Sequence, residues 1–233
     1  MRFWTFPQRD EPWASKPLDD SGLTCAGYGC FACAIAAVFK FFGKDEDPAK
    51  FIDWMNDNGG FDKNGMLNVS TAGNRYTDID FIERIDCENS PAPIDKINSY
   101  LAQGIPVIAK LWFSKAGGYT HFVTIQDGDG SDYLIGDPWY GDERWLNSTS
   151  HGSGTPAERI LGIRVFKKTS QDPPPPPPPP SCPPCVCPPC PPPVVCPPEK
   201  ECPSCPVIDD LSASELIVKG LRKFLGGLLI IGK

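Results

Sequence analysis

The sequence predicts an α+β fold, in which helices come first along the chain and an antiparallel sheet follows. Three helical patterns precede residue 105, and four strand patterns with short connections come after it. Helices and strands in separate parts of a chain are typical of α+β proteins, whereas regular alternation is typical of parallel sheets. About 170 residues precede a proline-rich segment. That length suffices for one ordinary domain, which we expect over residues 1–168.

Three helices are expected, over residues 30–42, 47–60 and 93–104. The first is alanine-rich and carries bulky apolar residues at helical spacing, which is typical of a largely buried helix. The second has Asp47 as its N-cap and Pro48 in its first helical position. Each pattern is closed by glycine, which readily adopts the left-handed conformation found at helix ends.

Four strands are expected, over residues 107–113, 121–126, 132–136 and 160–166. The second and third flank Gly-Asp-Gly-Ser, which is a strong hairpin signal. If the turn centres on Asp129, residues whose numbers sum to 258 face each other, so that His121 lies opposite Asp137. Directly opposed side chains have Cβ atoms about 5 Å apart on one face. At that distance a carboxylate can orient an imidazole.

The charge balance argues against nucleic acid as a partner. The formal net charge is −7, and no basic patch is interleaved with aromatic residues. The opening segment MRFWTFPQRDEP has no apolar core, so no ordinary secretory signal is expected. No run of 18 or more uncharged apolar residues occurs, so no transmembrane helix is expected either.

Cys30 is the candidate nucleophile. It follows Gly-Tyr-Gly at the start of the first expected helix, where the helix dipole stabilises a thiolate. Cys33 lies one turn further along and is the alternative nucleophile, but the dipole favours its thiolate less. A small buried hydrophobic residue is the other interpretation of Cys30.

The candidate base is His121, with Asp137 as its partner. The chain has only two histidines, and the second, His151, lies in the glycine-containing segment STSHGSGT with no partner signal. Cys–His chemistry is therefore expected to use His121. Each residue also has a purely structural interpretation, since a lone histidine is often a core residue and an aspartate before proline often caps a turn.

The order of these motifs resembles that of the papain-like cysteine peptidases, and more narrowly the double-glycine (bacteriocin-processing) peptidase-like group. The similarity covers roughly residues 6–145. It rests on the Gln-Arg-Asp opening, the Gly-Cys start of the first helix, the Asn-Gly-Gly end of the second, and the His…Asp-Pro hairpin.

The resemblance implies a papain-like fold, in which the helix carrying the nucleophile packs on an antiparallel sheet. It implies Cys30 as nucleophile, His121 as general base and then acid, and Asp137 as the residue that orients the imidazole. The leader peptidases carry an oxyanion glutamine six residues before the cysteine, where this chain has Thr24. Gln8 is the only glutamine upstream of Cys30, so we assign it that role, beside the Cys30 backbone N–H.

The function that this resemblance implies is hydrolysis of peptide (amide) bonds through a thioester, with no metal or organic cofactor. Related domains of phages and bacteria act on peptidoglycan, so the expected substrate is a peptide or a peptidoglycan peptide. Such an enzyme would stay in the cytoplasm until release or travel with a virion. The alternatives are a catalytically inactive papain-like binding module and an oligomeric structural protein.

An extended linker is expected over residues 169–206, followed by an amphipathic C-terminal helix over 207–233. Residues 173–206 contain 19 prolines and 7 cysteines, a composition that favours polyproline II. Outward thiols on such a rod predict a disulfide-linked homo-oligomer, and zinc is less favoured because Pro-Pro between cysteines resists a knuckle turn. Residues 211–233 are basic on one face and apolar on another, which predicts a membrane surface or self-association as partner.

Overall fold

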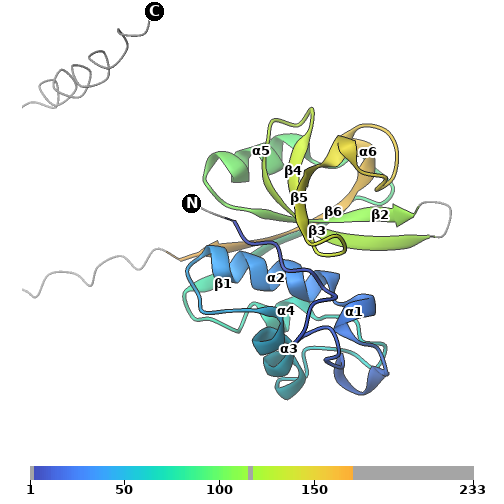
Figure 1. The fold of residues 1–233 in the computed structure, drawn as a ribbon. Helices are drawn as coiled ribbons and strands as arrows, with labels where there is room; N and C mark the ends of the chain where they lie inside the picture. The colour runs from blue at the N-terminus through green and yellow to red at the C-terminus, as the bar shows by residue number, and fades with distance from the viewer. Residues whose placement is uncertain (1–2, 115–117, 170–233) are drawn as a thin grey trace, which may run out of the picture. The chain divides into compact units, whose positions relative to one another are not determined.

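The computed structural model describes residues 3–114 and 118–169 (Figure 1). In chain order the elements are η1 (Asp19–Ser21), α1 (Cys25–Tyr28), α2 (Cys30–Phe41), α3 (Pro48–Asp57), α4 (Val69–Ala72), β1 (Ile79–Asp86), α5 (Ile94–Ala102), β2 (Val107–Ser114), β3 (Tyr119–Gly128), β4 (Tyr133–Asp137), β5 (Asp142–Trp145), η2 (Leu146–Ser148), α6 (Pro156–Arg159) and β6 (Ile160–Lys168). Beyond Thr169, the expected linker and C-terminal helix lie outside the described residues. Within those residues, no helix has the length and apolarity needed to cross a bilayer.

A single six-stranded antiparallel sheet organises the described residues, with strand order β1-β6-β2-β3-β4-β5. Helices α1 to α4 lie on one side of it, and α5 and α6 lie on the other (Figure 1). Because successive side chains of a strand point to opposite faces, β2 contributes residues to the hydrophobic core on each side of the sheet. Ile108 packs with the α2 and α3 side, whereas Val107 and Ala109 pack with Ile97 of α5. The expected α+β class is confirmed.

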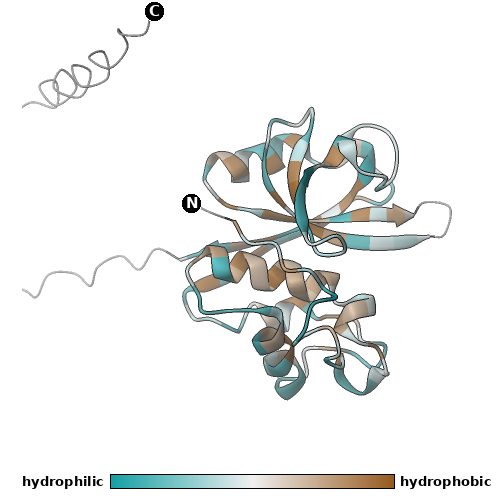
Figure 2. Cartoon of the chain, in the orientation of Figure 1, coloured by the Kyte–Doolittle hydropathy of each residue, from teal (hydrophilic) through white to brown (hydrophobic). Residues whose placement is uncertain are grey.

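The three long helices form where their patterns predict them. Helix α2 is buried from Ala32 to Phe39, and the colours of Figure 2 show that it is built mostly of apolar residues. Helix α3 begins as expected, because the Asp47 side chain accepts a hydrogen bond from the Lys50 backbone N–H and Pro48 takes the first helical position.

Two strands were not predicted. In β1 burial alternates from residue to residue, but the apolar Ile82 is exposed and the charged Glu83 that follows it is half-buried, beside a bulge between Phe81 and Glu83. Strand β5 is a four-residue edge strand with the sequence Asp-Glu-Arg-Trp and a largely exposed surface. Neither segment therefore carries the regular apolar period from which a strand is recognised.

The register of the β3–β4 hairpin differs from the expected one. Thr124 pairs with Gly136 and Ile125 with Ile135, so the numbers sum to 260 rather than 258. A bulge between Ile125 and Asp127 and a longer loop account for the difference. A shift of two residues keeps every side chain on its face, so His121 and Asp137 become diagonal neighbours instead of a directly opposed pair.

An aromatic stack joins the start of α2 to β3. The rings of Phe31 and Phe122 lie 4.1 Å apart between centroids, with 13° between their planes. Each ring belongs to the residue that directly follows a candidate catalytic residue, Cys30 or His121. Stacked aromatic pairs contribute about 0.5–1.5 kcal/mol beyond the area they bury. This contact therefore fixes the helix start against the strand.

Gly29 separates α1 from α2 by a single residue, and its lack of a side chain is required there. A Cβ at this position would lie 2.3 Å from Cys25 Sγ and 2.7 Å from the Cys25 Cα and carbonyl oxygen. We expect Gly29→Ala to lower the free energy of unfolding by about 1–3 kcal/mol, as overpacking does. Urea unfolding measures this change.

The matched control is Gly27→Ala in α1, because a Cβ there meets no atom within 4 Å. Alanine in a helix is favoured over glycine by about 0.5–1 kcal/mol, so this variant should be at least as stable as the wild type. Equal unfolding midpoints for the two variants would contradict the packing argument.

Candidate active site

Cys30 is the first residue of α2, and its thiol contacts His121 and Phe122 of β3. The imidazole of His121 and the backbone N–H groups of Phe31 and Phe122 hydrogen-bond to its thiol. Burial alone would raise the pKa of Cys30, but the positive charge of His121 and these hydrogen bonds together lower it below its usual value. The residue as a whole nevertheless keeps part of its surface exposed.

His121 lies in β3 and is almost fully buried. Its Nε2 is 2.7 Å from Asp137 Oδ1, which leaves Nδ1 for the thiol of Cys30. Burial lowers the pKa of the imidazole, but the Cys30 thiolate and the Asp137 carboxylate outweigh it and raise the pKa to about 9. A thiolate–imidazolium ion pair is therefore favoured at neutral pH.

Asp137 ends β4 and is fully buried. Its Oδ1 accepts from His121 Nε2 and from the Trp139 backbone N–H at 2.9 Å. Its Oδ2 accepts from His151 Nε2 at 2.6 Å. Burial would raise the pKa of this carboxyl, but the hydrogen bonds and charges of the two histidines hold it well below its usual range. Asp137 is therefore ionised.

The expectation that His151 has no partner is wrong. This residue is fully buried and contacts the same carboxylate as His121. The contact joins residues 14 positions apart, and His151 lies in an irregular segment between η2 and α6. No helical or strand period therefore predicts the contact. The one available signal was that the chain has just two histidines.

Gln8 lies where the N-terminal segment folds back onto the site. Its backbone N–H donates to the Pro138 carbonyl at 2.8 Å, next to Asp137. Its side-chain Nε2 donates to the Ala26 carbonyl at 2.9 Å and to the Cys25 carbonyl at 3.5 Å. Its Oε1 is buried and has no partner among the residues that the structure describes. The side chain is therefore fixed between the turn before the nucleophile and the loop after Asp137.

Cys33 is a weaker candidate nucleophile than Cys30. It is fully buried in α2, and burial together with the neighbouring Cys25 thiol raises its pKa well above the usual value. The Sγ atoms of Cys25 and Cys33 are 3.7 Å apart, and both residues are free thiols. Only a thiolate is a strong nucleophile, so the site favours Cys30.

Three side chains of the site are of types that bind transition metals. The ligand atoms of His121, Asp137 and His151 all lie within 4.8 Å of one another. A metal-bound histidine usually donates its other ring N–H to a supporting acceptor. Nδ1 of His151 has no partner, and Nδ1 of His121 faces Cys30. The arrangement therefore fits proton transfer better than a built metal centre.

These features define a class of protein, the thiol hydrolases with a nucleophile helix packed on an antiparallel sheet. Residues 3–154 match the Peptidase_C39-like family, so the chain belongs to this family. The chain is a papain-like cysteine peptidase, and both the expected family and the expected fold class are confirmed.

Comparisons with solved structures and with curated proteins give two further findings. The peptidase domain of Streptococcus ComA, a bifunctional ABC transporter involved in a quorum-sensing pathway, is similar in structure with a TM-score of 0.45 and 14% sequence identity. The match covers 72% of this chain and 99% of that domain. A comparison with curated proteins found no match.

The electrostatics of the site predict selective alkylation of Cys30. At pH 6 we expect iodoacetamide to modify Cys30 faster than Cys87, because burial and the nearby Asp86 raise the pKa of the Cys87 thiol. Peptide mapping by mass spectrometry measures both rates in one sample. In His121→Ala the advantage of Cys30 should disappear. Equal rates for the two cysteines in the wild type would contradict a thiolate at position 30.

Proposed function

We propose that this peptidase uses Cys30 as nucleophile, His121 as acid and base, and Asp137 as the residue that orients the imidazole. One observation carries the proposal: Asp137 holds His121 at 2.7 Å through Nε2, which leaves Nδ1 of the same ring for the Cys30 thiol. The chain of hydrogen bonds then runs from the nucleophile to a buried charge, the arrangement required of an activated cysteine.

Acylation begins with attack of the Cys30 thiolate on the carbonyl carbon of the scissile amide. The carbonyl electron pair moves to oxygen, and the S–C bond forms. When the C–N bond breaks, Nδ1–H of His121 gives its proton to the leaving amine, so that a neutral amine departs. The product is a thioester on Cys30 beside a neutral imidazole.

The oxyanion of the tetrahedral intermediate requires hydrogen-bond donors. Cys30 opens α2, and the first N–H groups of a helix have no partner within it, so its backbone N–H can donate. The Nε2 group of Gln8 carries two N–H bonds and lies 2.9 Å from the Ala26 carbonyl oxygen and 3.5 Å from the Cys25 carbonyl oxygen. In this proposal the N–H of the longer contact turns to the oxyanion and is the second donor. Loss of one such donor slows acyl transfer by about 10²–10³.

Deacylation reverses the roles of the same groups. The neutral His121 removes a proton from water, and the hydroxide attacks the thioester carbon. The C–S bond then breaks, the carboxylic acid product leaves, and the thiolate–imidazolium pair is restored. Asp137 stays ionised and stabilises the imidazolium at each stage.

The substrate in this proposal is a peptide, including the peptides of peptidoglycan handled by a phage or bacterial enzyme. Tyr28 and Tyr119 are 62% and 69% exposed, and each lies two residues before a catalytic residue. Exposed aromatic rings this close in sequence to the catalytic residues are the groups that we expect to pack against an extended peptide or a sugar ring. The proposal that peptidoglycan peptides are substrates rests on the resemblance of the sequence to domains of phages and bacteria that act on peptidoglycan.

Removal of the nucleophile tests the mechanism. We expect Cys30→Ala to reduce kcat/KM by about 10⁴-fold or more, because no other group can form the thioester. Cys87→Ala, which changes a cysteine distant in the fold, should keep wild-type activity. Both variants are assayed on a peptide library and on purified peptidoglycan. Cleavage of free peptides alone would reject the cell-wall substrate, and an active Cys30→Ala would reject the mechanism.

The pH dependence of kcat/KM tests the ion pair. Activity needs Cys30 deprotonated and His121 protonated, so the profile should be bell-shaped. His121 has a pKa raised to about 9, so activity should persist below that pH and fall as pH rises through it. Asp137→Asn removes a negative charge that raises the pKa of His121, so its alkaline limb should move to lower pH. An unchanged limb would contradict this role of Asp137.

A further inference from the structure

The carboxylate of Asp137 lies between two imidazoles, and only one of them belongs to the proposed mechanism. Nε2 of His121 is 2.7 Å from Oδ1, and Nε2 of His151 is 2.6 Å from Oδ2. An ionised carboxylate accepts hydrogen bonds and cannot donate them. Both Nε2 atoms therefore carry a proton and donate to Asp137.

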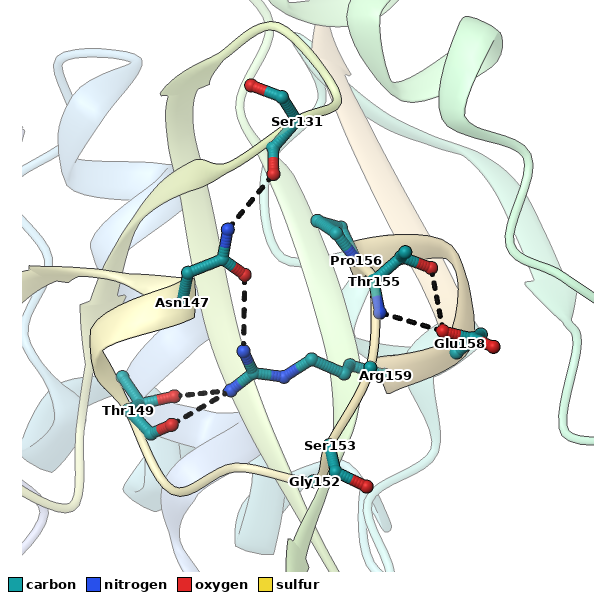
Figure 3. A pocket seen from close by; sticks show the side chains of 10 residues that line it. Ser131, Asn147, Thr149, Gly152, Ser153, Thr155, Pro156, Glu158 and Arg159 are labelled. Atoms are coloured by element: carbon teal, nitrogen blue, oxygen red, sulfur yellow. Dashed lines mark hydrogen bonds between the residues drawn. The ribbon is translucent and has the colours of Figure 1, made fainter.

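The loop that carries His151 is held by a buried arginine. Arg159 of α6 donates from Nε to the His151 carbonyl at 2.6 Å, and its guanidinium also bonds to the carbonyl and hydroxyl of Thr149. Figure 3 shows this side chain beside a polar pocket of about 570 Å³, with Asn147 as a further acceptor. The pocket is lined by the loop and contains none of the catalytic residues. Arg159, which lines this pocket, thus holds the backbone at position 151 in place.

An aromatic side chain fixes the planes of both imidazoles. The ring of Phe113 lies 5.3 Å from the ring of His121 and 5.3 Å from that of His151, between centroids. Trp139 packs on the same ring at 4.8 Å. Nδ1 of His151 is buried, and within residues 3–114 and 118–169 it has no hydrogen-bond partner. Among these residues, Asp137 is therefore the one group to which this ring hydrogen-bonds.

We propose that His151 is a positioning residue of the peptidase, which donates to Asp137 Oδ2 and thereby keeps Oδ1 aligned with His121 Nε2. This inference rests on the proposed function. Without His151, Oδ2 would be buried with no donor, a state that strongly favours rotation of a carboxylate toward another partner. Oδ1 already shares its lone pairs between His121 and the Trp139 N–H, so such a rotation would misalign the imidazole.

Three substitutions at position 151 separate hydrogen bonding from packing. His151→Leu removes the donor, His151→Gln keeps an N–H near the position of Nε2, and His151→Asn carries the same amide with too short a reach. Loss of a hydrogen bond to a charged group predicts a fall in kcat of about 10- to 100-fold in the Leu and Asn variants, with little change in KM. The Gln variant should recover most of kcat. Wild-type kcat in His151→Leu, or equal losses in Gln and Asn, would overturn the proposal.

A measurement on the wild-type chain applies even if a variant does not fold. The chain has only two histidines, so ¹⁵N-histidine labelling gives an NMR spectrum of two imidazole rings. The proposal requires a proton on Nε2 of His151. A His151 ring with its proton on Nδ1 and a bare Nε2 would overturn the proposal.

The alkylation assay distinguishes failure of this inference from failure of the proposed function. If Cys30 of the wild type is not alkylated faster than Cys87, the thiolate mechanism itself is wrong. If Cys30 reacts fast and the three variants at position 151 keep wild-type kcat, only the role of His151 is lost.

Discussion

The buried charge of Asp137 is the interaction on which the site depends. Burial opposes this charge, and three N–H donors on its two oxygens stabilise it. Once ionised, the carboxylate raises the pKa of His121, and the imidazolium in turn lowers that of Cys30. Because Asp137 and His121 are buried, each of these electrostatic effects is larger than it would be in solution. In the proposed mechanism, the reactivity of the Cys30 sulfur therefore depends on Asp137, which acts through His121.

The fold supplies this arrangement from rigid elements. Strands β3 and β4 carry His121 and Asp137 as neighbours in one sheet, and α2 presents Cys30 at its first turn. The Phe31–Phe122 stack fixes the helix against the strand, and Gly29 permits the close approach of α1. Sites built on helices and strands hold their geometry more closely than sites on loops. His151 is an exception, since it reaches the site from a loop, as Gln8 does from the irregular N-terminal segment.

The fixed position of His151 in a loop has a physical explanation. The loop between η2 and α6 is held by Arg159, which is almost fully buried and bonds to oxygens of the loop backbone and side chains. A capping box between Thr155 and Glu158 fixes the start of α6. The loop therefore has several anchors, and a loop anchored in this way can deliver a side chain to a fixed position.

By itself, the sequence determined the elements whose signals are local. The N-cap at Asp47, the apolar period of α2, the hairpin and the thiol at the helix start each follow from neighbouring residues, and the face shared by His121 and Asp137 follows from strand periodicity. The hairpin register, the strands β1 and β5, the fold-back of Gln8 and the place of His151 depend instead on packing in the folded molecule. A bulge, an edge strand and contacts through irregular segments leave no periodic pattern, because they depend on packing between residues far apart in the chain.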